Sequence, residues 1–294
     1  MAVDPFSAMA WAMATWTNID WRTVEGFGRE WAAYDQSGLD AEEHERLFAA
    51  YFSLFAFDGL GEGFDLGCGS GRWAKLVAPR VGHLHCIDPA GEALAVARRN
   101  LADLDNVSFH RAASDAIPLP DDSQDFGYSI GVLHHIPDAE AAMRDCVRKL
   151  KPGAQLLVYL YYRLDGRPAW FRALWRASDL VRKSVSRLPF RARKAVTDML
   201  AGAVYFPLAR LARLAEAAGL PAAGLPLYSY RNLSFYAMRT DALDRFGTSL
   251  EQRFTRGEIA AMMGRCGLVD VAFREEEPYW VAVGRKRHEP SRPL

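Results

Sequence analysis

The chain has 294 residues, no net formal charge at pH 7, and hydrophobic side chains at half of its positions. This length predicts one large domain, or a domain with an elaboration, and the hydrophobic content excludes a chain that is disordered throughout. The zero net charge argues against a nucleic-acid binder with a basic face. No apolar run reaches the roughly 20 residues that are needed to cross a bilayer.

The cysteines and the two ends of the chain add three expectations. The four cysteines are far apart and form no CxxC pair. We therefore expect neither a disulfide framework nor a metal site, and we predict a cytoplasmic location. Residues 1–20 start with small apolar side chains but lack the basic start of a signal peptide, so they are predicted to be an added or flexible terminus. Residues 287–294 are predicted to be a polar, frayed tail.

Taken in chain order, the first half of the sequence alternates helices with strands. Asp40 is placed to cap a helix that carries Glu42 and Glu43 in its first turn. A strand ending at Leu66 follows. The later elements are helices at 73–78, 90–101 and 139–150 and strands at 83–88, 106–110, 124–130 and 154–161. Such alternation predicts βαβ units and a parallel sheet.

The alternation stops after residue 162, where a basic and mainly helical insertion (163–240) begins. Pro189 and Pro207 are expected to divide it into separate helices. Thr255 and Glu258 have the spacing of a capping box for the helix that follows. Strands at 269–273 and 279–284 close the chain. The predicted domains are the N-terminal helices and core (21–162), the insertion, and a closing part of the core (241–286).

The stretch 64–73 predicts the end of a buried strand, a glycine turn and the start of a helix. Gly67, Gly69 and Gly71 leave the main chain without Cβ atoms on one side and allow positive φ. The free N–H groups at the start of a helix favour an anionic group in the same place. Asp88, at the end of the next strand, is placed to accept both hydroxyls of a ribose.

The loop differs from the G-x-G-x-x-G pattern of dinucleotide sites, because Arg72 stands where the third glycine is expected. Asp65 precedes the loop, and its charge would repel a pyrophosphate but suit an amino group. An amino acid joined to a nucleoside fits all of these features. Its carboxylate would meet the loop, its ammonium would meet acid or carbonyl groups, and its ribose would meet Asp88.

With these pieces the sequence resembles the class I S-adenosylmethionine-dependent methyltransferases. The matching stretches are 65–71, Asp88, 113–118, 131–136 and 150–154. The resemblance implies an α/β fold with a doubly wound, seven-stranded, mostly parallel sheet whose last strand is antiparallel. It implies that the three loop glycines approach the methionine part, that Asp115 bonds the adenine amino group, and that Ala116 lies beside the ring. The implied cofactor-binding set also contains Asp65, Cys68, Pro89, Ser114 and Gly131.

Simpler interpretations of these residues stay open. Asp65 could cap the turn that follows it, and Asp88 could cap the helix that starts near Ala90. Asp115 could be a surface turn residue, and Cys68 could be a small loop residue without a role in binding.

For catalysis, His134 is the first candidate for a base that removes a proton from the acceptor. Its ordinary pKa near 6.5 leaves the imidazole mostly neutral at cytosolic pH. Tyr34 and Tyr161 are weaker candidates. One of His134 and His135 is expected to face the pocket at the carboxyl end of the preceding strand. The histidines could instead be satisfied residues at a helix start, and Tyr159, Tyr161 and Tyr162 could be aromatic side chains of the core or of an interface.

The predicted function is transfer of a methyl group from S-adenosylmethionine to an oxygen or nitrogen of a small molecule, such as a secondary metabolite or a sugar. S-adenosylhomocysteine would be the product, and the insertion would cap the pocket. One alternative is a lipid-linked or anionic acceptor, with peripheral lipid contact through the arginines beside Trp170 and Trp175. Another is a non-catalytic cofactor-binding protein of the same fold.

Two further enzyme classes are disfavoured. The loop spacing argues against a nicotinamide-dependent reductase, and no RNP-like run points to an RNA methyltransferase. We expect no nucleic-acid partner and either a monomer or a homodimer. The basic face of the insertion could also be solvated or packed against another subunit.

Overall fold

The computed structural model describes residues 16–164 and 166–288. Most of the predicted terminus (1–15) and of the predicted tail (289–294) lies outside the described residues. The helices are α2 (Trp21–Ala33), α3 (Ala41–Tyr51), α4 (Ala74–Val77), α5 (Gly91–Asn100), α6 (Ala139–Lys149), α7 (Ala169–Val185), α8 (Phe190–Leu200), α9 (Phe206–Ala217), α10 (Phe235–Gly247) and α11 (Arg256–Arg265). The strands are β1 (Glu62–Leu66), β2 (His83–Ile87), β3 (Val107–His110), β4 (Gln124–Ile130), β5 (Leu150–Tyr159), β6 (Leu268–Phe273) and β7 (Val281–Lys286).

The strands form one seven-stranded sheet in the order β3-β2-β1-β4-β5-β7-β6. The pairs from β3 through β5 are parallel, and β7 runs antiparallel to both β5 and β6. The chain crosses over between β1 and β4, so the sheet is wound in both directions from this point. The fold prediction is thereby confirmed, and the crossover places a ligand site beyond the carboxyl ends of β1 and β4.

Two apolar clusters fill the two faces of the sheet because neighbouring strand residues point to opposite sides. On β5, Leu156 and Val158 pack with side chains of α6 and α11. Leu157, between them, packs in the other cluster with side chains of α3, α4 and α5. All three leucine and valine side chains are fully buried. Helices therefore cover both faces, and the carboxyl edge of the sheet is left to other segments.

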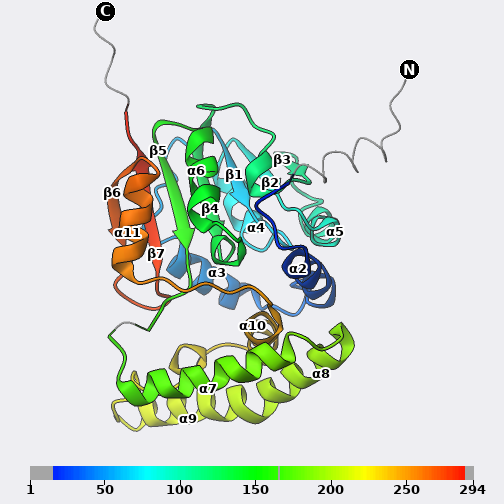
Figure 1. Cartoon of the computed structure of the whole chain (residues 1–294), viewed down its shortest axis with the longest axis vertical. Helices are drawn as coiled ribbons and strands as arrows, with labels where there is room; N and C mark the ends of the chain where they lie inside the picture. Colours follow the sequence, from blue (N-terminus) through cyan, green and yellow to red (C-terminus); the bar gives the residue numbers. More distant parts are fainter. Residues whose placement is uncertain (1–15, 165, 289–294) are drawn as a thin grey trace, which may run out of the picture.

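The insertion forms a separate helical layer beyond the carboxyl ends of the strands. Figure 1 shows β5 pointing towards this layer, with α10 between α7–α9 and the core. Its own apolar cluster includes Val185, Tyr205, Met238 and Phe246. Pro189 begins α8, as predicted. Pro207 does not separate two helices, because a π-helical turn joins α8 to α9 and the proline occupies the first turn of α9.

Two predicted helix starts are confirmed. Asp40 accepts a hydrogen bond from the Glu43 N–H and begins α3. Thr255 and Glu258 form the complete capping box at the start of α11. The stretch that contains Phe27 and Trp31 forms α2, whose own cap is Asp20.

Residues 16–20 are bonded to the core, although they fall within the predicted terminus. Trp16 stacks on Trp21 with ring centroids 5.6 Å apart. Asn18 donates to the Asp138 carbonyl and accepts from the Asp138 N–H, both at 2.8 Å. The segment thus lies across the loop that follows β4 and leads into α2.

A carboxylate, Asp198 on α8, joins the end of α2 to the insertion. The Tyr34 hydroxyl donates to it at 2.5 Å, Lys194 at 2.8 Å, and Arg239 donates to both of its oxygens at 2.9 Å. Burial acts to raise the pKa of Asp198, but the bonds from Arg239, Lys194 and Tyr34 outweigh it and hold the pKa well below the usual value of 3.8. The ionised form is therefore favoured in the folded protein.

We expect Asp198→Asn to lower the free energy of unfolding at pH 7 by about 1–2 kcal/mol, a range that allows for partial solvent screening. A carboxylate whose pKa is depressed by folding adds stability above its unfolded pKa and loses it as the pH falls. The difference in the free energy of unfolding between wild type and variant should therefore become smaller below about pH 4. Urea unfolding at pH 7 and pH 3.5 measures this. Asp103→Asn on the exposed surface is the control, and an equal effect of both substitutions would contradict the assignment.

No helix in the described ranges is long and apolar enough to cross a membrane. All four cysteines are buried and unpaired.

Candidate functional site

A cavity with about 760 Å³ of space, open to solvent, lies beyond the carboxyl ends of β1, β2 and β4. The lining comes from α2 and the segment before it, from the ends of the strands, and from the loop after β4: Asn18, Ile19, Asp20, Thr23, Val24, Phe27, Trp31, Leu66, Gly67, Asp88, Pro89, Ala90, Ala113, Ser114, Ile130, Gly131, Val132, His135 and Ile136.

Five of the predicted cofactor-binding residues line this cavity, namely Gly67, Asp88, Pro89, Ser114 and Gly131. Six others do not belong to the lining among the described residues: Asp65, Cys68, Gly69, Gly71, Asp115 and Ala116. In the sequence, each of them lies within four residues of a residue that lines the cavity. The predicted set is thus brought to one place, but only part of it faces the open space.

Helix α2 covers the cavity, and the sequence analysis assigned it no role in the site. The cap Asp20 and the helix residues Thr23, Val24, Phe27 and Trp31 all line the cavity, and their helical spacing places them on one face of α2. Trp31 lies directly over the glycine loop, because a Cβ atom on Gly69 would be 2.8 Å from its indole Nε1. The aromatic residues of this stretch were the available signal, and their helical spacing could have placed them on one face.

The glycine loop is bent and tightly packed. Gly67 has a φ of +78°, and a Cβ atom there would lie 2.3 Å from a methyl carbon of Val132. The N–H groups of Gly67 and Cys68 bond the Ile87 carbonyl, and that of Gly71 bonds the Cys68 carbonyl. These donors are already used inside the protein. An anionic group at the loop would therefore depend on other N–H groups than these.

We expect Gly67→Ala to lower the free energy of unfolding by about 3 kcal/mol. About 1–2 kcal/mol is the cost of positive φ for an L-residue, and the overlap with Val132 adds about 1–3 kcal/mol. Gly219→Ala is a matched control, since Gly219 has a φ of +74° with no atom within 4 Å. Chemical denaturation of both variants and of Gly67→Ala/Val132→Ala separates the two costs. Equal losses for Gly67 and Gly219 would remove the role of packing.

The lining contains two acidic residues, Asp20 and Asp88. Both carboxylate oxygens of Asp88 accept a hydrogen bond from the main chain. Oδ2 accepts from the Gly69 N–H at 2.9 Å and Oδ1 accepts from the Ala90 N–H at 2.8 Å. Burial raises the pKa of Asp88 to about 6, against the lowering effect of these two bonds. Asp88 is therefore not the cap of α5 that the simpler interpretation proposed, because Ala90 occupies the cap position and, at this helix start, Asp88 bonds only the N–H of that residue. Each oxygen also keeps a second lone pair for a ligand hydroxyl.

At one end of the cavity, lining residue Ser114 and its neighbour Asp115 have polar atoms that lack partners among the described residues. Ser114 Oγ and Asp115 Oδ1 are both buried without a hydrogen bond. Asp115 Oδ2 accepts from the N–H groups of Thr17 and Asn18 at 2.6 and 3.0 Å. Burial acts to raise the pKa of Asp115, but these N–H groups outweigh it and hold the pKa low. Since buried polar atoms normally have partners, this end is suited to a ligand that offers an amino group.

Asp65 lies behind the loop on β1, where it is buried beside Tyr128. Burial raises its pKa to about 8, and the nearby Asp88 adds to this effect. Asp65 is therefore mostly uncharged at pH 7. In this position it lacks the negative charge on which the expected contact with an ammonium group depends.

The two histidines after β4 have different surroundings. His135 lines the cavity, whereas His134 is fully buried and stacks on Tyr161 with ring centroids 3.7 Å apart. His135 Nδ1 lies 2.7 Å from the Leu250 carbonyl oxygen, so Nδ1 must carry the proton in this bond. His135 Nε2 is left with the lone pair of the neutral ring and lies 3.7 Å from Asp244 Oδ1.

Burial keeps both imidazoles neutral at pH 7. It lowers the pKa of His135 to about 4 and that of His134 well below its usual value. The Asp244 carboxylate beside His135 has a pKa raised to about 6, chiefly by burial. The Tyr161 hydroxyl donates to Asp244 Oδ2 at 2.5 Å. His135, Asp244 and Tyr161 thus form a connected group next to the cavity.

The two tyrosines that were weaker candidates for the base are both engaged elsewhere. Burial raises the pKa of Tyr161 well above its usual value, so its phenolate is costly to form. Burial and Asp198 likewise raise the pKa of Tyr34. Among the described residues, neither tyrosine belongs to the lining of the cavity.

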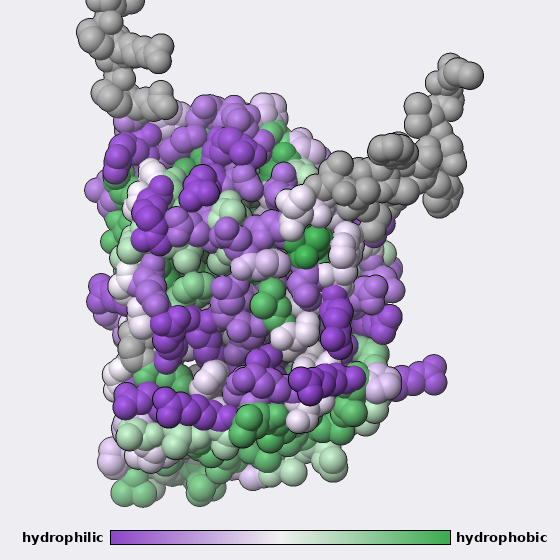
Figure 2. Space-filling model, viewed as in Figure 1, coloured by the Kyte–Doolittle hydropathy of each residue, from purple (hydrophilic) through white to green (hydrophobic). Residues whose placement is uncertain are grey.

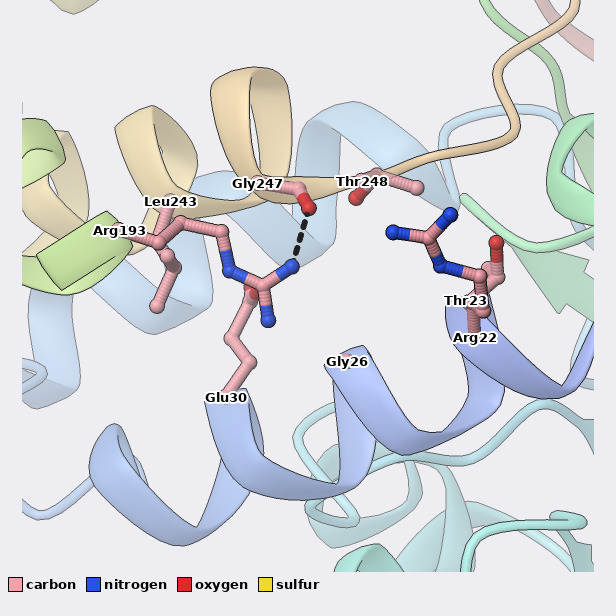
Figure 3. A pocket seen from close by; sticks show the side chains of 8 residues that line it. All are labelled: Arg22, Thr23, Gly26, Glu30, Arg193, Leu243, Gly247 and Thr248. Carbon is pink, nitrogen blue, oxygen red and sulfur yellow. Dashed lines mark hydrogen bonds between the residues drawn. The ribbon is translucent and has the colours of Figure 1, made fainter. Parts of the chain in front are cut away.

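A second, smaller hollow of about 220 Å³ lies between α2, α8 and α10. In Figure 3, Glu30 from α2 points towards Arg193 from α8, which donates to the Gly247 carbonyl at 2.7 Å. Burial raises the pKa of Glu30 well above its usual value, and Asp244 and Asp241 add to this effect. Thr23 lines both hollows. The smaller one is a junction between the covering helix and the insertion.

Comparisons with known proteins agree with this geometry. Residues 64–158 match the family model of a methyltransferase domain. Methyltransferase GfsG from Streptomyces halstedii is 32% identical over 130 residues, which are 42% of this chain and 47% of that protein. Phosphoethanolamine N-methyltransferase 2 from Caenorhabditis elegans is 33% identical over 100 residues, which are 33% and 23% of the two chains. The match thus spans less than half of each relative.

Solved structures share the fold. An O-methyltransferase family protein from Burkholderia thailandensis has a TM-score of 0.51 at 14% identity, covering 91% of this chain and 60% of that chain. An S-adenosylmethionine-dependent methyltransferase from Thermotoga maritima, described as a possible histamine N-methyltransferase, has a TM-score of 0.50 at 14% identity, covering 90% and 100%. The matched residues 64–158 contain the glycine loop, Asp88 and the loop after β4. Residues 64–158 therefore match a methyltransferase domain, and the chain shares the fold of these solved structures.

Proposed function

We propose that the whole chain transfers a methyl group from S-adenosylmethionine to an oxygen or nitrogen of a small-molecule acceptor. The observation that carries this proposal is the composition of the larger cavity. It combines the Asp88 carboxylate, the bent main chain at Gly67 and the unpartnered hydroxyl of Ser114, with the unpartnered Oδ1 of Asp115 next to the lining. A ribose, an amino-acid chain and an adenine need these three kinds of surroundings.

The residues of the chain would divide the work of binding. Asp88 would hold the ribose, Ser114 and Asp115 would bond the adenine edge, and the loop after β4 would border the reacting end. The bound cofactor supplies a methyl group that is already activated by the positive charge of its sulfur. What is left for the protein is to orient the acceptor and to exclude water, and α2 with Phe27 and Trp31 is placed to do so.

His135 is the base that we propose for an acceptor that must lose a proton. Its Nδ1–H is fixed on the Leu250 carbonyl, so the lone pair stays on Nε2, which is buried and has no hydrogen-bond partner among the described residues. Asp244 Oδ1, 3.7 Å from Nε2, would stabilise the resulting imidazolium. His134, the first choice from the sequence, is separated from the cavity by its packing on Tyr161 and would act on the orientation of this group instead.

A small acceptor is supported by the names of the relatives. One acts on phosphoethanolamine and others on demethylmenaquinone. The choice between a secondary metabolite, a sugar and an anionic or lipid-linked acceptor stays a prediction, as do the cytoplasmic location and the state of monomer or homodimer. No residue of the insertion (163–240) appears in the described lining of the cavity, so a capping role would be exerted through α2 and α10.

The test is calorimetric titration of the full chain with S-adenosylhomocysteine, S-adenosylmethionine and NADH. We expect heat with the first two and none with NADH. Incubation with a methyl-labelled donor and a panel of amines, phenols and sugars then shows whether any acceptor is methylated. Tight binding without transfer to any of them would support the non-catalytic alternative. Absence of binding would overturn the proposal.

A further inference from the structure

The exposed large apolar side chains are concentrated in the insertion. Among the described residues, all of them except Trp21 lie between positions 170 and 235. Figure 2 shows them as a band of apolar surface along the edge of the molecule that is furthest from the sheet. Monomeric proteins rarely leave a continuous apolar surface of this kind uncovered. This edge is therefore a candidate surface for a partner.

Helix α7 and the turn that follows it, 186–188, carry three distinct faces. One face packs inward and includes the buried Arg182 and Val185. A second face is basic and consists of the exposed Arg172, Arg176, Lys183 and Arg187, which we call the basic edge. The third face is apolar and exposed, with Trp170, Leu174, Val181 and Leu188 at spacings of four or seven residues. A helix in contact with water alone would not need this third face.

Helix α9 continues the apolar surface. Leu208, Leu211 and Leu214 are exposed there, and Leu214 keeps 67% of its surface open. We call these leucines and the apolar face of α7 together the apolar base. In Figure 1, α7 and α9 form the lower edge of the molecule, where Figure 2 shows the apolar band below a row of hydrophilic side chains. The apolar base is thus bordered by the basic edge.

Among the residues that the structure describes, the charges without an ion-pair partner around the apolar base are positive. Between residues 166 and 235 the described carboxylates are already bonded: Asp179 to Arg182 and Lys183, Asp198 within its cluster, and Glu216 to Arg231. Within the described ranges, Arg176 and Arg187 have no ion pair. A second copy docking through the same face in a two-fold arrangement would bring basic edges near each other. An anionic surface would instead complement both the charge and the apolar area.

We propose that the apolar base and the basic edge dock the protein on an anionic lipid surface. The helices α7 and α9 lie in the plane of the interface, with their apolar side chains among the acyl chains and the arginines at the level of the headgroup phosphates. Trp170, which is 55% exposed, sits at the start of this face, where an indole suits the interface. This docking does not depend on methyl transfer and goes beyond the proposed function.

The experiment is flotation of the full chain with extruded vesicles of phosphatidylcholine alone or with 30% phosphatidylglycerol. We expect binding to the anionic vesicles at low salt, little binding to the neutral ones, and a blue shift of the tryptophan emission on binding. Each basic side chain removed from the basic edge should weaken binding about fivefold. Arg176→Gln/Arg187→Gln should therefore lose about 25-fold, while Leu211→Asp/Leu214→Asp should abolish binding.

Arg46→Gln/Arg99→Gln removes the same charge from exposed positions on the core, and it should bind like wild type. Thermal unfolding of every variant confirms that these exposed substitutions leave the fold intact. Equal binding of the core and basic-edge variants would overturn the proposal, and so would absence of binding to anionic vesicles. A stable dimer in sedimentation velocity that Leu211→Asp/Leu214→Asp converts to monomer, without vesicle binding, would assign the surface to a second copy instead. S-adenosylhomocysteine binding is measured separately, so its failure would concern only the proposed function.

Discussion

Asp88→Ala is expected to weaken binding of S-adenosylhomocysteine by at least about 100-fold. Two ribose hydroxyls would lose a charged acceptor, and a hydrogen bond to a charged group contributes about 1.5–3 kcal/mol. A factor of ten corresponds to about 1.4 kcal/mol, so loss of both bonds accounts for a 100-fold effect or more. The substitution also frees the N–H groups of Gly69 and Ala90, which hold the loop and the start of α5. Calorimetric titration measures the change.

Asp103→Ala is the matched control, because it removes an exposed carboxylate from the same domain. It should bind like wild type. Thermal unfolding of Asp88→Ala shows how much of its loss comes from a disturbed loop. If the variant stays folded and still binds within threefold of wild type, the ribose does not lie at Asp88.

The pKa of Asp88 also predicts how the binding of S-adenosylhomocysteine depends on pH. Its pKa in the free protein is raised to about 6, so the carboxyl is protonated below that pH. The protonated form has fewer lone pairs for the two N–H groups and the two hydroxyls. Affinity should therefore fall as the pH drops from 7 to 5 and level off above 7. Titrations at four pH values test this, and a flat profile would contradict it.

The glycine loop shows how far sequence reasoning reached. The bend at Gly67 and the closeness of Asp88 follow from residue types and spacing along the chain. What the loop glycines face could not be derived in this way. The space beside Gly67 is filled by Val132, and the space beside Gly69 is filled by Trp31 from α2. Both contacts join parts of the chain that lie far apart in sequence, so no local pattern reports them.

The charge state of Asp65 and the partners of Asp115 could not be derived from the sequence for a similar reason. Asp65 was expected to face an ammonium group, yet burial beside Tyr128 raises its pKa to about 8 and leaves it mostly neutral. Burial depends on the neighbouring strands β2 and β4, which pair with β1 at this position. A sequence shows that an acid is present, but its environment decides whether it is charged. Asp115 is held by Thr17 and Asn18 from a segment that was assigned to the terminus.

His134 and His135 are adjacent in the sequence, so a shift of one residue decides which imidazole faces the cavity. Adjacent residues in a short helical turn point in different directions, and only the packing of Tyr161 and α10 shows which one meets the cavity. His135 does, and we expect His135→Gln to lower the rate of methyl transfer about 100-fold with the best acceptor of the panel, a usual size for loss of a general base. S-adenosylhomocysteine binding should stay within about threefold of wild type, which separates a chemical role from a structural one.

His134→Gln is the matched control, with the same chemical change one position away. Its effect on the rate should be at least tenfold smaller, because His134 does not line the cavity among the described residues. A larger loss of methyl-transfer rate in His134→Gln than in His135→Gln would assign the role of general base to His134. A readout that needs no acceptor is the ring ¹⁵N spectrum of His135. It should show the Nδ1–H tautomer at pH 7, since only a protonated Nδ1 can bond the Leu250 carbonyl, and protonation only near pH 4, because burial disfavours the charged ring.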